Sequence, residues 1–121
     1  MKVVKFGGSS LASATQIKKV CKIITSDPER KIIVVSAPGK ANKDDTKVTD
    51  MLIACANAKL AGNSAEKELA AVIKRFTDIA EELGLDKTIT NEIASDLANR
   101  VNSDTSDENK FMDLVKAAGE D

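Results

Sequence analysis

The hydrophobic pattern of the first 37 residues alternates between strand and helix. Residues 2–6, KVVKF, are strand formers with a lysine alternating among apolar side chains. Residues 12–25 place apolar positions at helical spacing, and residues 31–37, KIIVVSA, return to a strand pattern. The continuous apolar run Ile32 to Val35 is typical of a strand covered on both faces. Strand, helix and strand with short links predict a parallel βαβ unit with a right-handed crossover.

Beyond Pro38 the pattern becomes almost wholly helical. A polar loop, PGKANKDD, leads into four apolar stripes at helical spacing. These stripes predict helices over about 46–60, 63–83, 89–101 and 106–118. Ser13 with Gln16, and Thr105 with Glu108, have the spacing of capping boxes at helix N-termini.

The two predicted strands are too few for a sheet of the usual size. Parallel sheets are normally covered on both faces, and a sheet commonly has about five or six strands. The pattern therefore predicts an α/β protein in which residues 1–45 form a βαβ part and residues 46–121 a helical part. It also predicts that the strands belong to a larger sheet and that the chain is a segment of a bigger protein.

Composition limits the partners that the chain can recognise. Its 121 residues carry 18 Lys and Arg against 19 Asp and Glu, a net charge of −1, with no Trp or Tyr. A nucleic-acid surface would normally show a basic excess with stacking aromatics. No apolar run approaches the length of a bilayer span, and no leader-like segment opens the chain. We expect a soluble cytoplasmic protein with no nucleic-acid or membrane partner.

The two cysteines, Cys21 and Cys55, each fall on the apolar stripe of a predicted helix. The chain contains no His, so neither a mixed Cys–His zinc site nor a Cys–His nucleophile can be assembled. We predict that both thiols are reduced core residues and that the chain has no metal site of its own.

The clearest candidate for chemistry is the turn between the first strand and the first helix. Residues 7–10 read Gly-Gly-Ser-Ser, and Lys5 precedes them. Backbone amides of a glycine turn can form an anion-binding concavity, and Lys5 adds a positive charge, so the stretch suits a phosphate. The alternative is a tight turn whose glycines only permit unusual dihedral angles. A P-loop is absent, because Ala41 follows the lysine of Pro38-Gly39-Lys40.

The second strand ends in another serine and glycine, in the sequence SAPG from Ser36 to Gly39. Because parallel strands open their carboxyl ends on the same side, we expect Ser36 to meet Ser9 and Ser10 in one crevice. By themselves, Thr49 and Asp50 read as helix-surface polarity, and Glu120 as a solvated tail.

Four stretches together resemble the aspartokinases, members of the amino acid kinase family. They are KFGGSSLA, VVSAPG, TDML and FMDLVKAAGE, so the resemblance covers the whole chain. It implies the N-terminal part of an amino-acid-kinase αβα sandwich. In that family the nucleotide-binding half of the kinase domain and the ACT regulatory domains follow, and neither is represented in these 121 residues.

The resemblance implies a role for nine residues. ATP phosphates would be held by Lys5, which also offsets charge during transfer, and by the Phe6, Gly7, Gly8 and Ser9 stretch. Aspartate would contact Ser10, Ser36, Thr49 and Glu120, with Ser36 close to both substrates and Glu120 pairing with the amino group.

The implied reaction is transfer of the ATP γ-phosphate to the side-chain carboxylate of L-aspartate, giving 4-phospho-L-aspartate, the opening step toward lysine, threonine and methionine. ATP and Mg²⁺ are the implied cofactors, and a homo-oligomer the implied assembly. The nucleophile is a carboxylate ionised at pH 7, so the absence of His is no obstacle. The isolated segment is expected to be inactive.

Two alternatives remain open from the residues. Another amino acid kinase, acting on glutamate or acetylglutamate, would share most of the pattern. A helical protein-interaction module, with the βαβ start as scaffold, would account for the long helical stretch.

Overall fold

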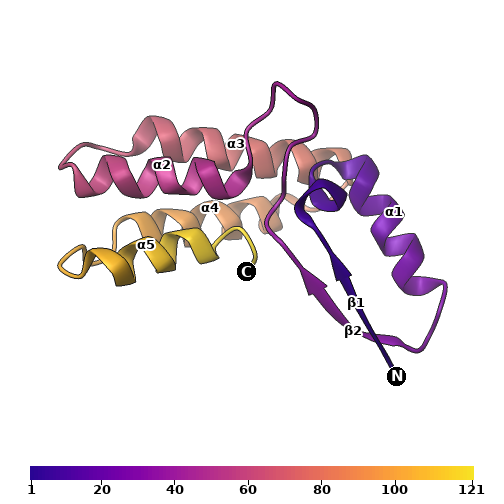
Figure 1. Ribbon diagram of the computed structural model, residues 1–121. Helices are drawn as coiled ribbons and strands as arrows, with labels where there is room; N and C mark the ends of the chain where they lie inside the picture. The colour runs from indigo at the N-terminus through magenta and orange to yellow at the C-terminus, as the bar shows by residue number, and fades with distance from the viewer.

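A two-stranded parallel sheet and a bundle of helices make up the computed structural model, which describes all residues from Met1 to Asp121 (Figure 1). The elements in chain order are β1 (Lys2–Phe6), the 3-10 helix η1 (Gly8–Leu11), α1 (Ala14–Thr25), β2 (Arg30–Val35), α2 (Val48–Leu60), α3 (Glu66–Glu82), α4 (Lys87–Val101) and α5 (Glu108–Ala117). The predicted α/β class, the parallel strand pair and the helical remainder are confirmed.

The strands of the βαβ unit pair in parallel from Val3 opposite Ile32 to Phe6 opposite Val35. The turn that the sequence predicts between β1 and the long helix contains one short 3-10 helix, η1. Helix α1 then starts at Ala14, where the Ser13 hydroxyl accepts a hydrogen bond from the Gln16 N–H at 3.4 Å. The capping residue was therefore predicted correctly, and the helix begins two residues later than expected.

The apolar run of β2 is not covered on both faces. Ile32, Ile33, Val34 and Val35 are each 42–44% exposed. The run is exposed because the sheet of this chain has only two strands, both of them edge strands, which is fewer than the larger sheet that the pattern predicts.

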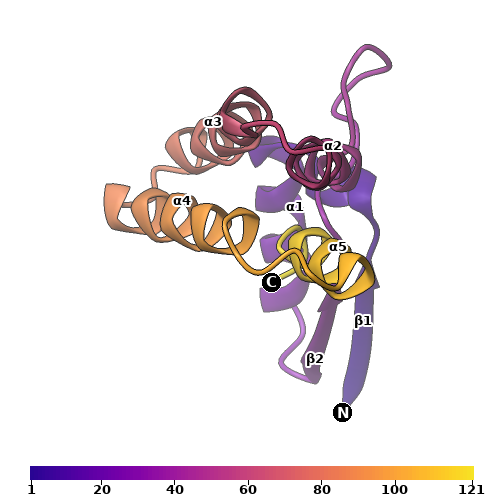
Figure 2. The same cartoon turned by 90° about the vertical axis from the view of Figure 1, so that its left-hand side faces the viewer.

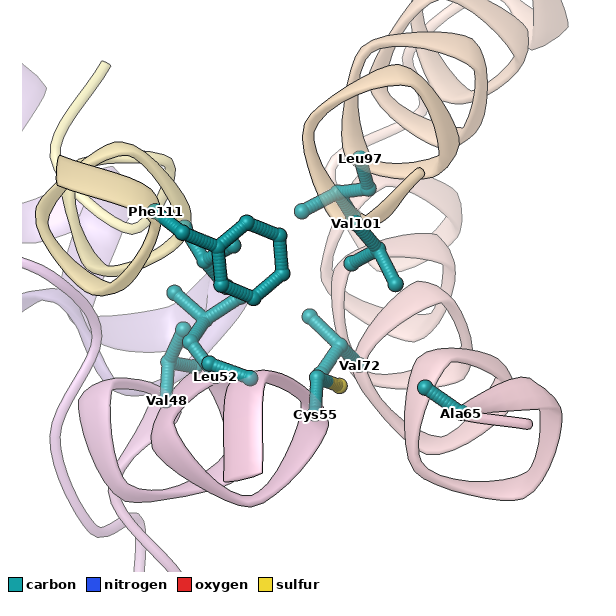
Figure 3. Packing of buried hydrophobic residues seen from close by; sticks show 10 residues of the cluster. Val48, Leu52, Cys55, Ala65, Val72, Leu97, Val101 and Phe111 are labelled. Atoms are coloured by element: carbon teal, nitrogen blue, oxygen red, sulfur yellow. The ribbon is translucent and has the colours of Figure 1, made fainter. Parts of the chain in front are cut away.

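The main hydrophobic cluster lies in the helical part. Helix α2 packs against α3 and α5, and α4 lies against both α3 and α5, so that the four helices surround a common centre (Figure 2). Ten buried side chains fill that centre: Val48, Leu52, Cys55, Ala56, Ala65, Val72, Leu97, Val101, Phe111 and Val115. Figure 3 shows them and labels all except Ala56 and Val115. None of the five α-helices combines the length and apolar character that a bilayer span needs.

The two cysteines differ in environment. Cys55 is fully buried in the bundle core, as predicted, and burial raises the pKa of its thiol to about 11, with a smaller contribution from the charge of Glu68. Cys21 is exposed, so its prediction as a core residue was wrong. It lies at the edge of the apolar stripe of α1, whose buried residues are Ala14 and Val20 only. Neither thiol is in a disulfide.

The N-terminus of α5 also differs from the prediction. Asp107 is its N-cap and accepts a hydrogen bond from the Lys110 N–H at 3.1 Å, so Thr105 is not the capping residue. Asp104 forms a turn of its own by accepting hydrogen bonds from the Ser106 N–H and hydroxyl. This turn shifts the helix start past Thr105.

Candidate functional site

The loops that follow β1 and β2 touch through two glycines. The Gly39 N–H donates a hydrogen bond to the Gly8 carbonyl at 2.8 Å. A Cβ on Gly39 would lie 2.8 Å from the Gly8 carbonyl carbon, and one on Gly8 would lie 3.0 Å from the Ala37 oxygen. Only residues without a side chain allow the loops to approach this closely. The carboxyl ends of the two strands are thereby joined at one edge of the sheet, as parallel pairing predicted.

Gly7 has no such internal reason to be glycine. Its backbone is extended, with φ −78° and ψ 173°, which any residue can adopt. A Cβ placed there would meet nothing within 4 Å. The fold itself therefore leaves the space in front of Gly7 open.

A cavity of about 340 Å³ lies where the two loops meet the start of α2. Its lining combines glycine backbone, two hydroxyls and two ammonium groups, from Gly8, Ser9, Ala37, Pro38, Gly39, Lys40, Lys47 and Thr49. No carboxylate lines it. Neither Lys40 nor Lys47 takes part in any of the six ion pairs of the molecule, so their charges are available to a ligand. The cavity is suited to an anion.

The N-terminus of α2 adds to this positive character. The Val48 N–H is used by the Pro38 carbonyl at 3.0 Å, and Lys47, the N-cap residue, offers no side-chain acceptor to the first turn. Thr49, in that turn, lines the cavity. Unpaired amides at a helix N-terminus attract negative charge.

The structure brings only some of the predicted residues to this cavity. Gly8, Ser9 and Thr49 line it, whereas Lys5, Phe6, Gly7, Ser10, Ser36 and Glu120 do not. Of the three serines expected in one crevice, only Ser9 is part of the lining. Lys5 is exposed on β1 opposite Val34 and makes no ion pair.

The remaining predicted residues flank the cavity at different points of the chain. Phe6 ends β1, and the Gly7 carbonyl accepts a hydrogen bond from the Ser10 N–H at 3.1 Å. Ser36 is half-buried between the end of β2 and Ala37, a lining residue.

The C-terminal residues are held near the same edge of the sheet. A Cβ on Gly119 would lie 2.7 Å from the Ala37 Cβ, so Gly119 is pressed against the end of β2. Asp121 pairs with Arg100 at 2.9 Å. Glu120 is exposed between these two residues. Its neighbour Gly119 contacts Ala37, which lines the cavity.

Sequence reasoning missed Lys40 and Lys47 as cavity residues. Their position near the two ends of the loop that follows β2 could have identified them from the sequence. Arg75 was missed as well: from α3 it pairs with Asp45 of the same loop at 3.1 Å. Asp45 also accepts hydrogen bonds from the Ala41 and Thr46 N–H groups at 3.0 and 2.9 Å. These bonds, with the charges of Arg75 and Lys40, hold the pKa of Asp45 below its ordinary value.

Metal binding finds no support in the arrangement of side chains. No group of three or more Cys, Asp or Glu residues is close enough to hold a metal ion. The lining of the cavity supplies amides, hydroxyls and ammonium groups, which are not the carboxylate oxygens that Mg²⁺ prefers. The donor set of this chain therefore does not fit a resident Mg²⁺.

Comparisons with known proteins agree on one family. The family model described as "Amino acid kinase family" matches residues 1–120. Aspartokinase 3 of Bacillus subtilis is 54% identical over 121 residues, which is 100% of this chain and 27% of that protein. The chain thus spans about a quarter of the length of that relative.

Solved structures match over nearly the whole chain. The aspartate kinase of Clostridium acetobutylicum superimposes with a TM-score of 0.78 at 34% identity, over 97% of this chain and 26% of that one. Escherichia coli aspartokinase III, solved with aspartate and ADP, gives a TM-score of 0.66 at 19% identity, over 98% of this chain and 26% of that one. The second match shows a shared fold only.

Proposed function

The chain belongs to the amino acid kinase family, and on that premise we propose that it forms the phosphate- and aspartate-binding part of an aspartate kinase. The reaction is transfer of the γ-phosphate of ATP to the side-chain carboxylate of L-aspartate, which gives 4-phospho-L-aspartate and ADP. The relatives named above, aspartokinases of two bacteria at 54% and 34% identity, support this choice within the family.

The observation that carries the proposal is the acid-free cavity at the end of the parallel strands. It combines a glycine turn, two unpaired lysines and the N-terminus of a 13-residue helix. Each of these groups favours oxyanions, and open α/β sheets bind ligands at the carboxyl ends of their strands. Gly7 adds support, because its open space serves no internal packing.

Phosphoryl transfer asks a protein mainly to position two anions and to offset their charge. The Gly7 and Gly8 amides and the Lys5 ammonium would stabilise oxygens of the transferring group, while Lys40 and Lys47 reduce repulsion between ATP and aspartate. The aspartate carboxylate is ionised at pH 7, so no residue of this chain needs to remove a proton from it.

Aspartate would lie beside the phosphates at the same edge of the sheet. Thr49 offers a hydroxyl from the first turn of α2, and Ser10 and Ser36 offer hydroxyls from the two loops. Glu120, exposed and anchored on both sides, would pair with the substrate amino group. Its role predicts that Glu120→Gln raises the KM for aspartate and leaves the KM for ATP nearly unchanged.

The cofactor and the assembly follow from the same proposal. Mg²⁺ would enter with the phosphates of ATP, since the cavity lining carries no carboxylate. We place the protein in the cytoplasm, as a homo-oligomer that opens the biosynthesis of lysine, threonine and methionine. Residues 1–45 would contribute most of the phosphate site and residues 46–121 most of its helical support.

The proposal is tested by a graft into a working enzyme. Residues 1–121 replace the matching segment of Bacillus subtilis aspartokinase 3, and aspartate-dependent ADP release is measured. We expect activity with aspartate and none with glutamate or acetylglutamate. The 121-residue polypeptide alone should show no turnover. A folded graft that is inactive with aspartate, or that prefers another acceptor, contradicts the proposal.

Lys5→Ala in the graft tests the chemistry itself. Loss of one preorganised charge donor should lower kcat on the order of 100-fold, with little change in aspartate binding. Lys2→Ala is the matched control, because Lys2 lies on the same strand but pairs with Asp27 at 2.6 Å. The control should keep near-normal kcat. Equal losses in both variants would remove Lys5 from the site.

A further inference from the structure

Arg75 connects three separate segments of the chain. It projects from α3 with its side chain only 13% exposed. Its guanidinium donates hydrogen bonds to the Ala12 carbonyl at 3.0 Å, the Gly39 carbonyl at 2.7 Å and the Thr46 carbonyl at 3.0 Å. It also pairs with Asp45 at 3.1 Å. One side chain thus binds the segment after β1 and both ends of the loop after β2.

The bond to Gly39 reaches directly into the candidate phosphate site. The Gly39 carbonyl accepts from Arg75, and its N–H donates to the Gly8 carbonyl at 2.8 Å. Gly8 and Gly39 both line the cavity. A continuous chain of hydrogen bonds therefore runs from the α3 guanidinium to the glycine turn.

The bond to Asp45 reaches the cavity from the other end of the loop. The Asp45 carboxylate closes residues 41–46 into a ring by accepting from the Ala41 and Thr46 N–H groups. The two cavity lysines, Lys40 and Lys47, lie immediately before and after this ring. Arg75 thereby fixes the backbone from which both lysines project.

We propose that Arg75 is a positioning residue of the phosphate site. It holds the glycine turn after β1 and the lysine-bearing loop after β2 in one fixed geometry without touching the ligand. This inference rests on the proposed function for its catalytic consequence, but not for its structural consequence. These contacts require the planar guanidinium of arginine, whose N–H groups point in fixed directions toward several acceptors. The compact ammonium group of lysine cannot reproduce that arrangement.

Arg100 is the other arginine with several partners: it binds Asp96, Asp121 and the Leu114 carbonyl and is 15% exposed. Its partners belong to the helical bundle and the chain end, and none of them lines the cavity. The partners of Arg75 lie instead at the two loops that form the cavity.

The structural consequence is measured by amide hydrogen exchange on the 121-residue chain. Arg75→Ala should speed exchange of the Gly39 N–H by at least about tenfold more than that of core amides of α2, such as Cys55. Val72→Ala is the control for general destabilisation, since Val72 is fully buried on the same helix one turn earlier. In that variant the Gly39 and Cys55 amides should accelerate together.

The catalytic consequence is measured in the graft described above. Arg75→Ala should raise the KM for ATP on the order of tenfold while the KM for aspartate changes less than about twofold. Arg75→Lys, which keeps the positive charge and loses the guanidinium fork, should recover only part of the ATP affinity. Val72→Ala should lower the melting temperature and leave both KM values unchanged.

The outcomes separate the two proposals. Selective acceleration at Gly39 together with a selective rise in the ATP KM supports Arg75 as a positioning residue. An Arg75→Ala protein that is only less stable, with exchange and KM values following the Val72→Ala control, overturns it. A graft with no activity before any substitution contradicts the proposed function alone, and the exchange arm still decides the role of Arg75.

Discussion

At the scale of single residues, Gly7 and Gly39 look alike in the sequence and differ in the structure. Gly39 is in contact with the backbone of Gly8 and Ser9, where a Cβ would lie within 3.1 Å of three of their atoms. Gly7 has an ordinary extended conformation and empty space around it. Packing within the chain requires glycine at position 39 and does not require it at position 7.

This difference predicts a split between stability and activity. Gly39→Ala forces the two loops apart and should cost about 1–3 kcal/mol of unfolding free energy. Gly7→Ala fits the native backbone and should leave stability within about 1 kcal/mol of the parent, in the stabilising direction. In the graft, however, Gly7→Ala should lower phosphoryl transfer on the order of 100-fold, since its methyl group would stand in the open space that we propose for the transferring phosphoryl group.

Thermal melts and coupled ADP-release assays on the two variants measure both effects. Gly62→Ala is not a suitable control, because Gly62 has a positive φ of 82°. Asn63→Ala, at an exposed position on the loop before α3 and far from both strands in the sequence, serves better. A Gly7→Ala graft with full activity would show that the open space in front of Gly7 has no role in catalysis.

At the scale of elements, the N-cap residue determines where a helix begins, and α5 allows this to be tested by mutation. The structure assigns the cap to Asp107, which bonds the Lys110 N–H, and not to Thr105. Asp107→Ala should therefore cost about 1 kcal/mol of stability, whereas Thr105→Ala should cost less than half of that. Urea unfolding of the two variants tests this. A larger loss for Thr105→Ala would restore the capping box that the sequence suggested.

The helices show which features a sequence can predict and which it cannot. The apolar stripes of α2 to α5 gave all four helices, because burial in a bundle requires side chains at a 3.6-residue period. Thr105 was misassigned because residue spacing does not show which of two nearby side-chain oxygens caps the helix. Cys21 was misassigned because spacing does not show how much of the helix surface is buried by its neighbours. The Arg75 contacts had no local signal at all, since its partners lie 29 to 63 residues away.

At the scale of the whole molecule, the helical part buries its apolar side chains and the strand pair leaves many of its own exposed. All ten residues of the main hydrophobic cluster belong to the helical part, while four consecutive residues of β2 remain 42–44% exposed. A hydrophobic strand pair with two free edges invites pairing with another chain. The sequence predicted this imbalance, because two strands with a doubly apolar pattern need more neighbours than 121 residues supply.

The imbalance predicts that the 121-residue polypeptide self-associates through its sheet. Ile32 and Val34 alternate along β2 and therefore share one face, in register with Val3 and Lys5. Replacing both with Lys should shift the protein from oligomer to monomer in a light-scattering concentration series. Ala61→Lys with Ala70→Lys is the control: it moves the net charge equally, from −1 to +1, on exposed positions of the helical part. If the control disperses the oligomer as well, charge and not the sheet governs association. A parent chain that stays monomeric at every concentration contradicts the prediction outright, because the exposed strands would then be stable in water without a partner.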